Sequence, residues 1–166
     1  MKHADDFIAL IPRLRRYARA LVADRSGADD LVQDTLERAW SRLHLWQRGT
    51  DLRAWLFTVM HNVNVNRVRA SHQHATLDED ALEADYRPVE HGALELRDLE
   101  RALAALSVEQ RGVLLLIVLE DMSYAEVAAT LGIPLGTVMS RLSRARERMR
   151  TMMHGHPPVV KLKRVK

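Results

Sequence analysis

The stretch "SYAEVAATLGIPLGTVMSRLSRAR" (Ser123–Arg146) contains two helix-favouring segments separated by a sharp turn. Ser123 and Glu126 match the S-x-x-E pattern of a capping box, which starts a helix. Gly132 suits the left-handed residue that ends one helix, and Pro134 is tolerated in the first turn of the next. The pattern predicts helices over about 124–131 and 135–149. Two helices joined by a short glycine-containing turn are typical of a helix-turn-helix.

The second of these helices has one apolar face and one polar, basic face. Apolar residues recur at steps of four, three and four, which predicts a buried stripe of Val138, Leu142, Ala145 and Met149. The remaining side chains are expected to point outward: Thr137, Met139, Ser140, Arg141, Ser143, Arg144, Glu147 and Arg148. Because the major groove of DNA admits an α-helix and arginine bonds guanine bidentately there, this face predicts DNA binding. The alternative is a solvated basic helix at the end of a bundle.

Composition favours an all-α protein. Hydrophobic residues make up 47% of the 166, while there are only 7 glycines and 5 prolines. The absence of cysteine excludes disulfides and thiolate metal sites. No apolar run reaches the roughly 18 residues of a membrane span, and the first residues lack the apolar core of a signal peptide. We therefore expect a cytoplasmic protein without membrane insertion.

Charge is distributed unevenly along the chain. Residues 24–37 hold five acids and one arginine, residues 77–100 hold nine acids and two arginines, and residues 141–166 hold nine bases and one acid. A polyanion is the expected partner of the basic end, and a different kind of partner is expected at the acidic stretches. Solvation of ordinary helix faces is the alternative.

The chain divides into two helical segments. In the first segment we expect helices over about 5–22, 26–43 and 52–71, with Ser26 capping the second helix and Thr50 or Asp51 capping the third. The acidic stretch that follows contains Pro88 and loses helical periodicity. The predicted domains are 1–71 and 93–153, joined by a linker over 72–92 and followed by a basic tail over 154–166.

The first domain presents three separate features. They are the acidic helix "DDLVQDTLERAW", a loop that contains Trp46, and a helix that carries Asn62 off its apolar face. Aromatic side chains beside basic and amide groups suit unstacked bases. Trp40 and Trp55 lie on apolar stripes and are expected in the core.

Taken in this order, four segments resemble a known family: "DDLVQDTLERAW", "GTDLRAWLFTVMHN", "LSVEQRGVLLL" and "SYAEVAATLGIPLGTVMSRLSRARERM". The chain resembles a bacterial RNA polymerase sigma factor of the extracytoplasmic-function (ECF) group, which contains only regions 2 and 4. The resemblance covers nearly the whole chain apart from the linker and tail. It implies promoter-directed transcription initiation by core RNA polymerase, with reading of the −10 and −35 elements and help in melting the DNA.

The resemblance also implies roles for particular residues. Asp30, Gln33 and Asp34 match positions that bind the clamp helices of the largest polymerase subunit, and the flap is the second expected polymerase contact. Trp46, Gln47 and Arg48 match the loop that captures a flipped −10 base, and Asn62 matches a residue that faces the same element. Over the −35 element, Met139, Ser140, Ser143 and Arg144 match base-facing positions, while Arg141 and Arg148 are expected to meet phosphates. Met139 and Ser143 depart from residues common in the family, so the −35 sequence does not follow. An anti-sigma factor is the expected restraining partner.

Two other function classes remain open from the residues. The first is a self-sufficient helix-turn-helix repressor or activator whose first half dimerises or senses a signal. The second is a nucleic-acid-processing enzyme, which the lack of a nucleophile-elbow pattern or phosphate-binding glycine loop disfavours. The pairs His72/His74 and His154/His156 lack carboxylates at fixed spacing, so we expect no metal, and we expect no cofactor and no catalytic residue.

Overall fold

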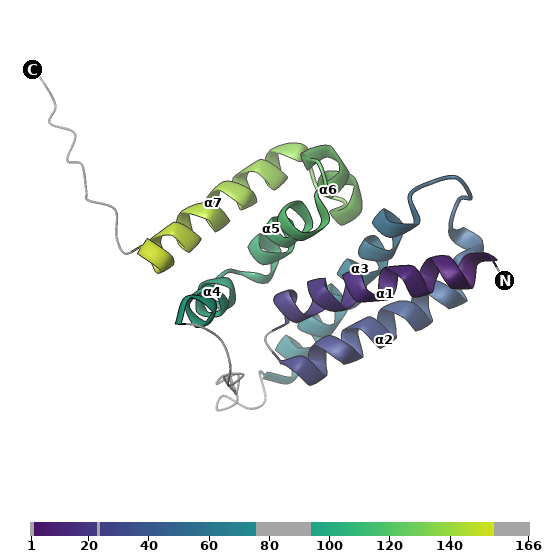
Figure 1. The fold of residues 1–166 in the computed structure, drawn as a ribbon, viewed down its shortest axis with the longest axis horizontal. Coiled ribbons are helices and arrows are strands. Elements are labelled where there is room, and N and C mark those ends of the chain that lie inside the picture. Colours follow the sequence, from purple (N-terminus) through teal and green to yellow (C-terminus); the bar gives the residue numbers. More distant parts are fainter. Residues whose placement is uncertain (1, 23, 76–93, 155–166) are drawn as a thin grey trace, which may run out of the picture.

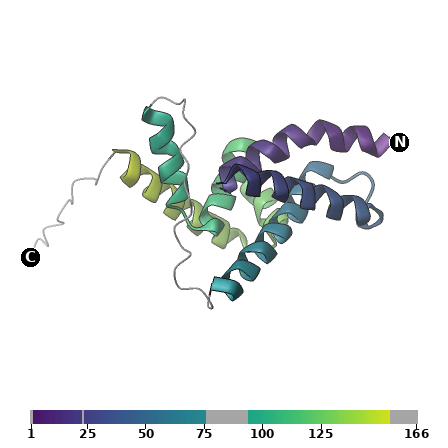
Figure 2. The same cartoon turned by 90° about the horizontal axis from the view of Figure 1, so that it is seen from below.

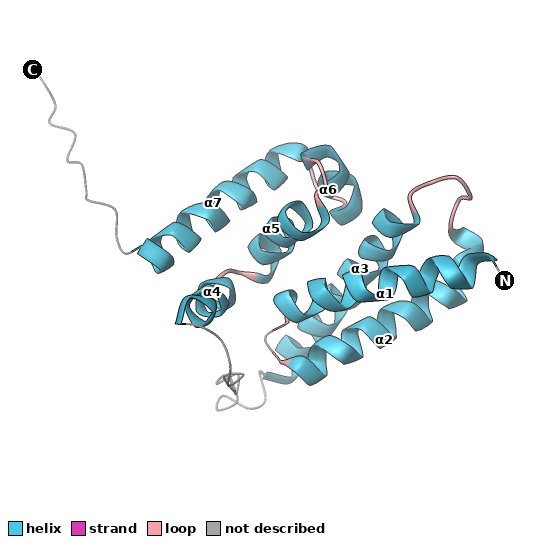
Figure 3. Ribbon diagram, in the orientation of Figure 1, coloured by secondary structure: helices cyan, strands magenta, loops and turns pink. Residues whose placement is uncertain are grey.

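A computed structural model of the chain describes residues 2–22, 24–75 and 94–154. Within these ranges the structure is helical, with short connections and no strand (Figure 3). The helices are α1 (Lys2–Leu21), α2 (Arg25–Ser41), the short 3-10 helix η1 (Leu43–Leu45), α3 (Leu52–Ala75), α4 (Leu94–Ala104), α5 (Val108–Glu120), α6 (Tyr124–Leu131) and α7 (Leu135–His154). This confirms the expected all-α class. The predicted linker and tail fall largely outside the described residues.

In the first half, α2 packs against both α1 and α3. The apolar stripe of α1 supplies Leu14 and Tyr17, and α3 supplies Leu56, Phe57 and Met60, all of them buried. Tyr17 and Phe57 meet edge to face, with ring centroids 5.1 Å apart. Burying a side chain of this size stabilises a fold by about 1.5–3 kcal/mol, so this shared stripe defines how the three helices pack.

The second half is built on the predicted helix-turn-helix. Ser123 and Glu126 make both bonds of a capping box at the start of α6, and Gly132 ends that helix in the left-handed conformation at φ 64°. The stripe predicted on α7 is also observed, because Val138, Leu142 and Ala145 are buried and Met149 packs beside them. α7 contacts α4, α5 and α6, and so closes this half of the molecule.

The two halves pack directly on each other, with α1 against α5 and α3 against α6. Figure 1 shows α5 next to α1, with α7 on the outer side of the second half, and Figure 2 shows the same packing from below. The buried side chains form one continuous cluster that includes Leu14 of α1 and Val113 of α5. The placement of the halves, which the sequence leaves open, is therefore a closed one.

Three local features differ from the sequence-based expectations. Asp24, and not Ser26, caps α2, since the Asp24 carboxylate accepts hydrogen bonds from the Ser26 and Gly27 amides at 3.3 and 2.7 Å. The expected loop over 44–51 begins with η1. α3 continues to Ala75, beyond the expected end near residue 71.

Candidate nucleic-acid and protein interfaces

The outward face of α7 carries most of the residues predicted to read DNA. Ser140, Ser143, Arg144 and Arg148 are exposed, and Met139 has 53% of its surface accessible. Thr137 is half-buried. The Ser140 hydroxyl donates to the Thr137 carbonyl at 3.1 Å, and its oxygen can still accept a hydrogen bond. A helix with an exposed hydroxyl and guanidinium face above a buried stripe is suited to the major groove.

Arg141 differs from the rest of this face because it is half-buried toward the first half of the molecule. It lines a cleft of about 450 Å³ together with His61 and Asn64 of α3 and Glu109 of α5. Burial holds the pKa of His61 below its ordinary value, the Arg141 charge lowers it further, and Glu109 opposes both. In this arrangement Arg141 faces α3 as well as the outer surface.

The loop before α3 presents one side chain inward and two outward. Gln47 and Arg48 are exposed, whereas Trp46 is half-buried with its ring edge-on to His3 of α1 at 5.5 Å. The buried Trp46 indole N–H has no hydrogen-bond partner among the described residues. The Thr50 hydroxyl donates to the Gln47 carbonyl at 2.7 Å, which fixes the tip of the loop.

Asn62 is exposed on α3. It lies about 15 Å along the helix from the loop, given a rise of 1.5 Å per residue. The Asp51 carboxylate accepts from the Arg53 and Ala54 amides at 2.9 and 3.3 Å and so caps α3, as predicted. The cap joins the loop and α3 into one continuous element.

The predicted protein-binding residues share the exposed face of α2. Asp30, Gln33 and Asp34 are all accessible, and Gln33 donates to Glu37 at 3.4 Å. Asp30 lies 3.9 Å from Arg67 of α3 across the surface. An exposed ion pair of this kind contributes little to stability, so both groups are available to a partner.

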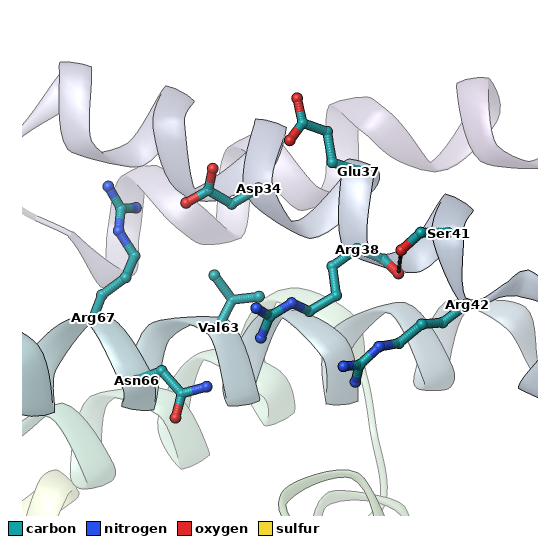
Figure 4. Close-up of a pocket in the computed structure, with 8 residues that line it drawn as sticks. All are labelled: Asp34, Glu37, Arg38, Ser41, Arg42, Val63, Asn66 and Arg67. Carbon is teal, nitrogen blue, oxygen red and sulfur yellow. Dashed lines mark hydrogen bonds between the residues drawn. The ribbon is translucent and has the colours of Figure 1, made fainter.

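Figure 4 shows how this face continues into a hollow of about 700 Å³ between α2 and α3. Asp34 and Glu37 stand on one rim, and the guanidinium groups of Arg38, Arg42 and Arg67 point into the hollow (Figure 4). Acidic side chains on the rim therefore lie beside basic side chains in the hollow. Such a pattern suits a partner that carries charges of both signs.

Sequence reasoning missed two features of the structure. Trp40, expected in the core, is 56% exposed on α2, and it meets the ring of Phe7 in a T-shaped contact with centroids 5.6 Å apart. Glu120, at the end of α5, is completely buried, although nothing in its local sequence distinguishes it from a solvated acid.

A groove of about 690 Å³ with an apolar floor lies on the second half and reaches α1. Leu103, Leu115, Val118 and Met149 contribute to its floor, and basic side chains that include Arg146 line it as well. Val118 is 60% exposed. An apolar floor with basic side chains beside it is suited to an amphipathic helix that carries acidic residues.

In the part of the chain that the structure describes, no group of His, Asp and Glu side chains is arranged to hold a metal ion. The described helices also include none with the length and apolarity to cross a bilayer.

Comparison with known proteins finds a family match for each half of the chain. The family model for the Sigma2 domain of PhyR matches residues 7–61, and the model for Sigma-70 region 4 matches residues 96–149. The chain is 33% identical to the ECF RNA polymerase sigma factor EcfG of Rhodopseudomonas palustris, over 90% of this chain and 84% of that protein. It is 32% identical to the ECF sigma factor SigE of Mycolicibacterium smegmatis, over 93% of this chain and 60% of that protein.

A solved structure shares the arrangement. The sigma factor RpoE from Bartonella quintana, crystallised with the anti-sigma factor NepR, superposes with a TM-score of 0.81 at 33% identity, covering 92% of this chain and 96% of that one. With two region-specific family matches and relatives that span the chain, this protein belongs to the ECF family of RNA polymerase sigma factors.

Proposed function

We propose that this chain directs core RNA polymerase to promoters, with its first half binding the polymerase and the −10 element and its second half reading the −35 element. The observation that carries the proposal is the exposed face of α7, where Ser140, Ser143 and Arg144 stand outward over a stripe that fixes the helix against α5. Membership of the ECF family supplies the context in which this face meets DNA. The chemistry of RNA synthesis belongs to the polymerase, and the cytoplasm, where polymerase and DNA meet, is the proposed site of action.

At the polymerase, the acidic face of α2 is the proposed contact with the clamp helices of the largest subunit. Asp30, Gln33 and Asp34 are accessible, and Gln33 and Asp34 each lie about one turn along the helix from Asp30. Complementary charge steers such an association and sets its orientation. The second half is proposed to reach the flap.

At the −10 element, the loop from Trp46 to Arg48 and the exposed face of α3 at Asn62 are proposed to hold melted DNA. Extruding a base costs a few kcal/mol, and stacking returns about 1–3 kcal/mol per base. The Trp46 indole N–H, which lacks a partner among the described residues, gains one if the loop rearranges around a base.

At the −35 element, Arg144 is the proposed base contact of longest reach, with Met139, Ser140 and Ser143 beside it. Arg148 lies one turn further on and is proposed to meet a phosphate, which positions the helix without reading sequence. Arg141 is proposed to meet a phosphate once its side chain is free of the cleft.

An anti-sigma factor is the proposed restraining partner. The solved relative from Bartonella quintana was crystallised with one. The groove on the second half offers an apolar floor beside the side chains of Arg146 and Arg150, which favours an acidic amphipathic helix as the occupant.

Transcription in vitro with core polymerase on a library of promoters tests the proposal. The expected result is initiation that depends on the chain and is confined to templates that share two short elements at fixed spacing. Chain-independent initiation, or repression through binding of the chain alone to an inverted repeat, contradicts it and favours a self-sufficient repressor.

A further inference from the structure

The two halves are joined by reciprocal contacts between α1 and α5. Near the start of α5, Arg111 donates to the Leu21 carbonyl at the end of α1 at 2.6 Å. Further back along α1, five residues before its end, Arg16 donates to the Leu119 carbonyl at the end of α5 at 2.7 Å. The two helices therefore run antiparallel. Each half places an arginine at the carboxyl end of a helix in the other, where the helix dipole favours a cation.

Glu120 lies at the centre of these contacts and has no exposed surface. Its carboxylate accepts a hydrogen bond from Arg16 Nη2 at 3.2 Å, and its backbone carbonyl accepts one from Arg53 Nη1 of α3 at 2.7 Å. Arg13 Nε stands 3.0 Å from the second carboxylate oxygen, but its N–H is not aimed at that oxygen, so the contact is an ion pair only.

All three of these arginines come from the first half of the chain, while Glu120 belongs to the second. A buried carboxylate without cationic partners is strongly disfavoured, so Glu120 is stable in this position only while the first half covers it. The side chains of Arg13 and Arg16 keep 40% and 54% of their surface in solvent. When the halves separate, water can therefore hydrate all of these charged groups.

The closed arrangement is too small to engage two promoter elements together. Elements 25 positions apart are separated by roughly 85 Å of duplex at 3.4 Å per base pair. A compact chain of this length has a radius of gyration of about 15 Å. The two halves must therefore separate before each can engage its own element.

We propose that Glu120 and the arginines of the first half form a latch that holds the free chain closed, so that opening precedes promoter reading. The effect of opening on promoter reading rests on the proposed function, whereas the existence of the latch does not. A binding-competent state that is only partly populated weakens apparent affinity in proportion to its population. The proposed clamp contact on α2 is exposed in the closed chain, but the second half is also proposed to reach the flap, so release of the latch strengthens binding by letting the polymerase engage both halves at once.

The latch is suited to opening because the hydrogen-bonding capacity of the Glu120 carboxylate is not fully used. One carboxylate oxygen of Glu120 accepts no hydrogen bond from the described residues. Buried ion pairs often contribute little net stability, because desolvation offsets their attraction. Removing two of the cations shifts the balance further toward the open state.

A distance measurement on the full chain tests the latch directly. The chain has no cysteine, so spin labels can be placed by Ser41→Cys on α2 and Met152→Cys on α7, both exposed positions. The expected distance distribution is narrow for the parent chain and broader and longer for the double variant Arg13→Ala/Arg16→Ala. The open-to-closed ratio is expected to rise about tenfold, which allows for the partial exposure of both arginines.

The matched control is Arg15→Ala/Arg19→Ala, which removes the same charge from exposed positions of the same helix. It is expected to keep the narrow distribution. Circular dichroism of each variant establishes that the helices persist. An equally narrow distribution in Arg13→Ala/Arg16→Ala, or equal broadening in the control, overturns the latch.

Affinity for core polymerase tests the consequence. The Arg13→Ala/Arg16→Ala variant is expected to bind up to about tenfold more tightly than the parent, in line with its gain in open state. Opening without any gain in affinity overturns the inhibitory role. Failure of every form to bind polymerase contradicts the proposed function, whereas the distances still decide whether the latch exists.

Discussion

Arg141 of α7 and His61 of α3 line one cleft between the two halves, and the arginine's charge adds to burial in holding the imidazole pKa below its ordinary value. A residue proposed for the −35 element thus interacts with the helix proposed for the −10 element. The cleft is also lined by Tyr17 of α1, by Arg69 and His72 of α3, and by Glu109 of α5, which opposes the shift.

The closed arrangement is expected to loosen as the pH falls. Because the pKa of His61 is lower in the closed state, the open state takes up the proton more readily. The closed state has its full stability above about pH 6.5, the ordinary pKa of histidine, and loses stability below it until the lowered pKa is passed. Label distances between pH 8 and pH 5 measure this. The same pH profile in His61→Gln contradicts the assignment, since other histidines would then be responsible.

Asp34→Arg is expected to weaken binding to core polymerase by about tenfold or more, because it places a cation on the acidic face of α2. The fold is expected to persist, since Asp34 is exposed. Fluorescence anisotropy of the labelled chain with purified core enzyme measures the affinity. Asp5→Arg makes the same charge change at an exposed position of α1, away from the proposed contact, and is expected to keep the parent's affinity. Equal affinity of Asp34→Arg and the parent chain counts against the clamp contact.

Arg144→Ala is expected to reduce discrimination at one −35 base pair by about 1–3 kcal/mol, the usual contribution of a bidentate arginine contact. Arg148→Ala, as a phosphate contact, is expected to weaken binding equally on all sequences. It is also expected to reduce the slope of log affinity against log salt concentration by about one. Holoenzyme binding to a panel of −35 variants separates the two. An equal loss of affinity on every −35 variant would identify Arg144 as a phosphate contact.

Trp46→Ala is expected to impair promoter melting more than polymerase binding, because the proposed base stacking takes place only on melted DNA. Permanganate reactivity of the −10 thymines reports melting. Trp40→Ala removes the same ring from α2, where it is largely exposed, and is expected to leave melting intact once polymerase is bound. Cooperative unfolding of Trp46→Ala at a markedly lower temperature would assign Trp46 to the core.

The second half could be predicted well because its signals are local. Ser123, Glu126 and Gly132 each act on backbone groups within a few residues, so the sequence contains both partners of each contact. The stripe from Val138 to Ala145 follows from helical periodicity alone. The roles of individual residues in DNA and polymerase binding stay predictions.

The relations between the halves could not be predicted because their partners lie far apart in the sequence. Glu120 is an ordinary acid in its own segment, and only Arg13 and Arg16, more than 100 residues earlier, account for its burial. The position of Trp40 on an apolar stripe predicts burial, but its ring contact with Phe7 leaves 56% of it exposed. For the cap of α2, both Asp24 and Ser26 fit the residue preference, and the helix begins one residue after the aspartate.

Binding of a labelled promoter duplex by the purified chain, with and without core polymerase, tests the division of labour between the halves most directly. Weak, unselective binding is expected of the chain alone. With core enzyme present, binding is expected to be tight and to depend on both the −10 and the −35 sequence. Tight binding of a dimer to an inverted repeat without polymerase, together with no association with core enzyme, would contradict this division of labour.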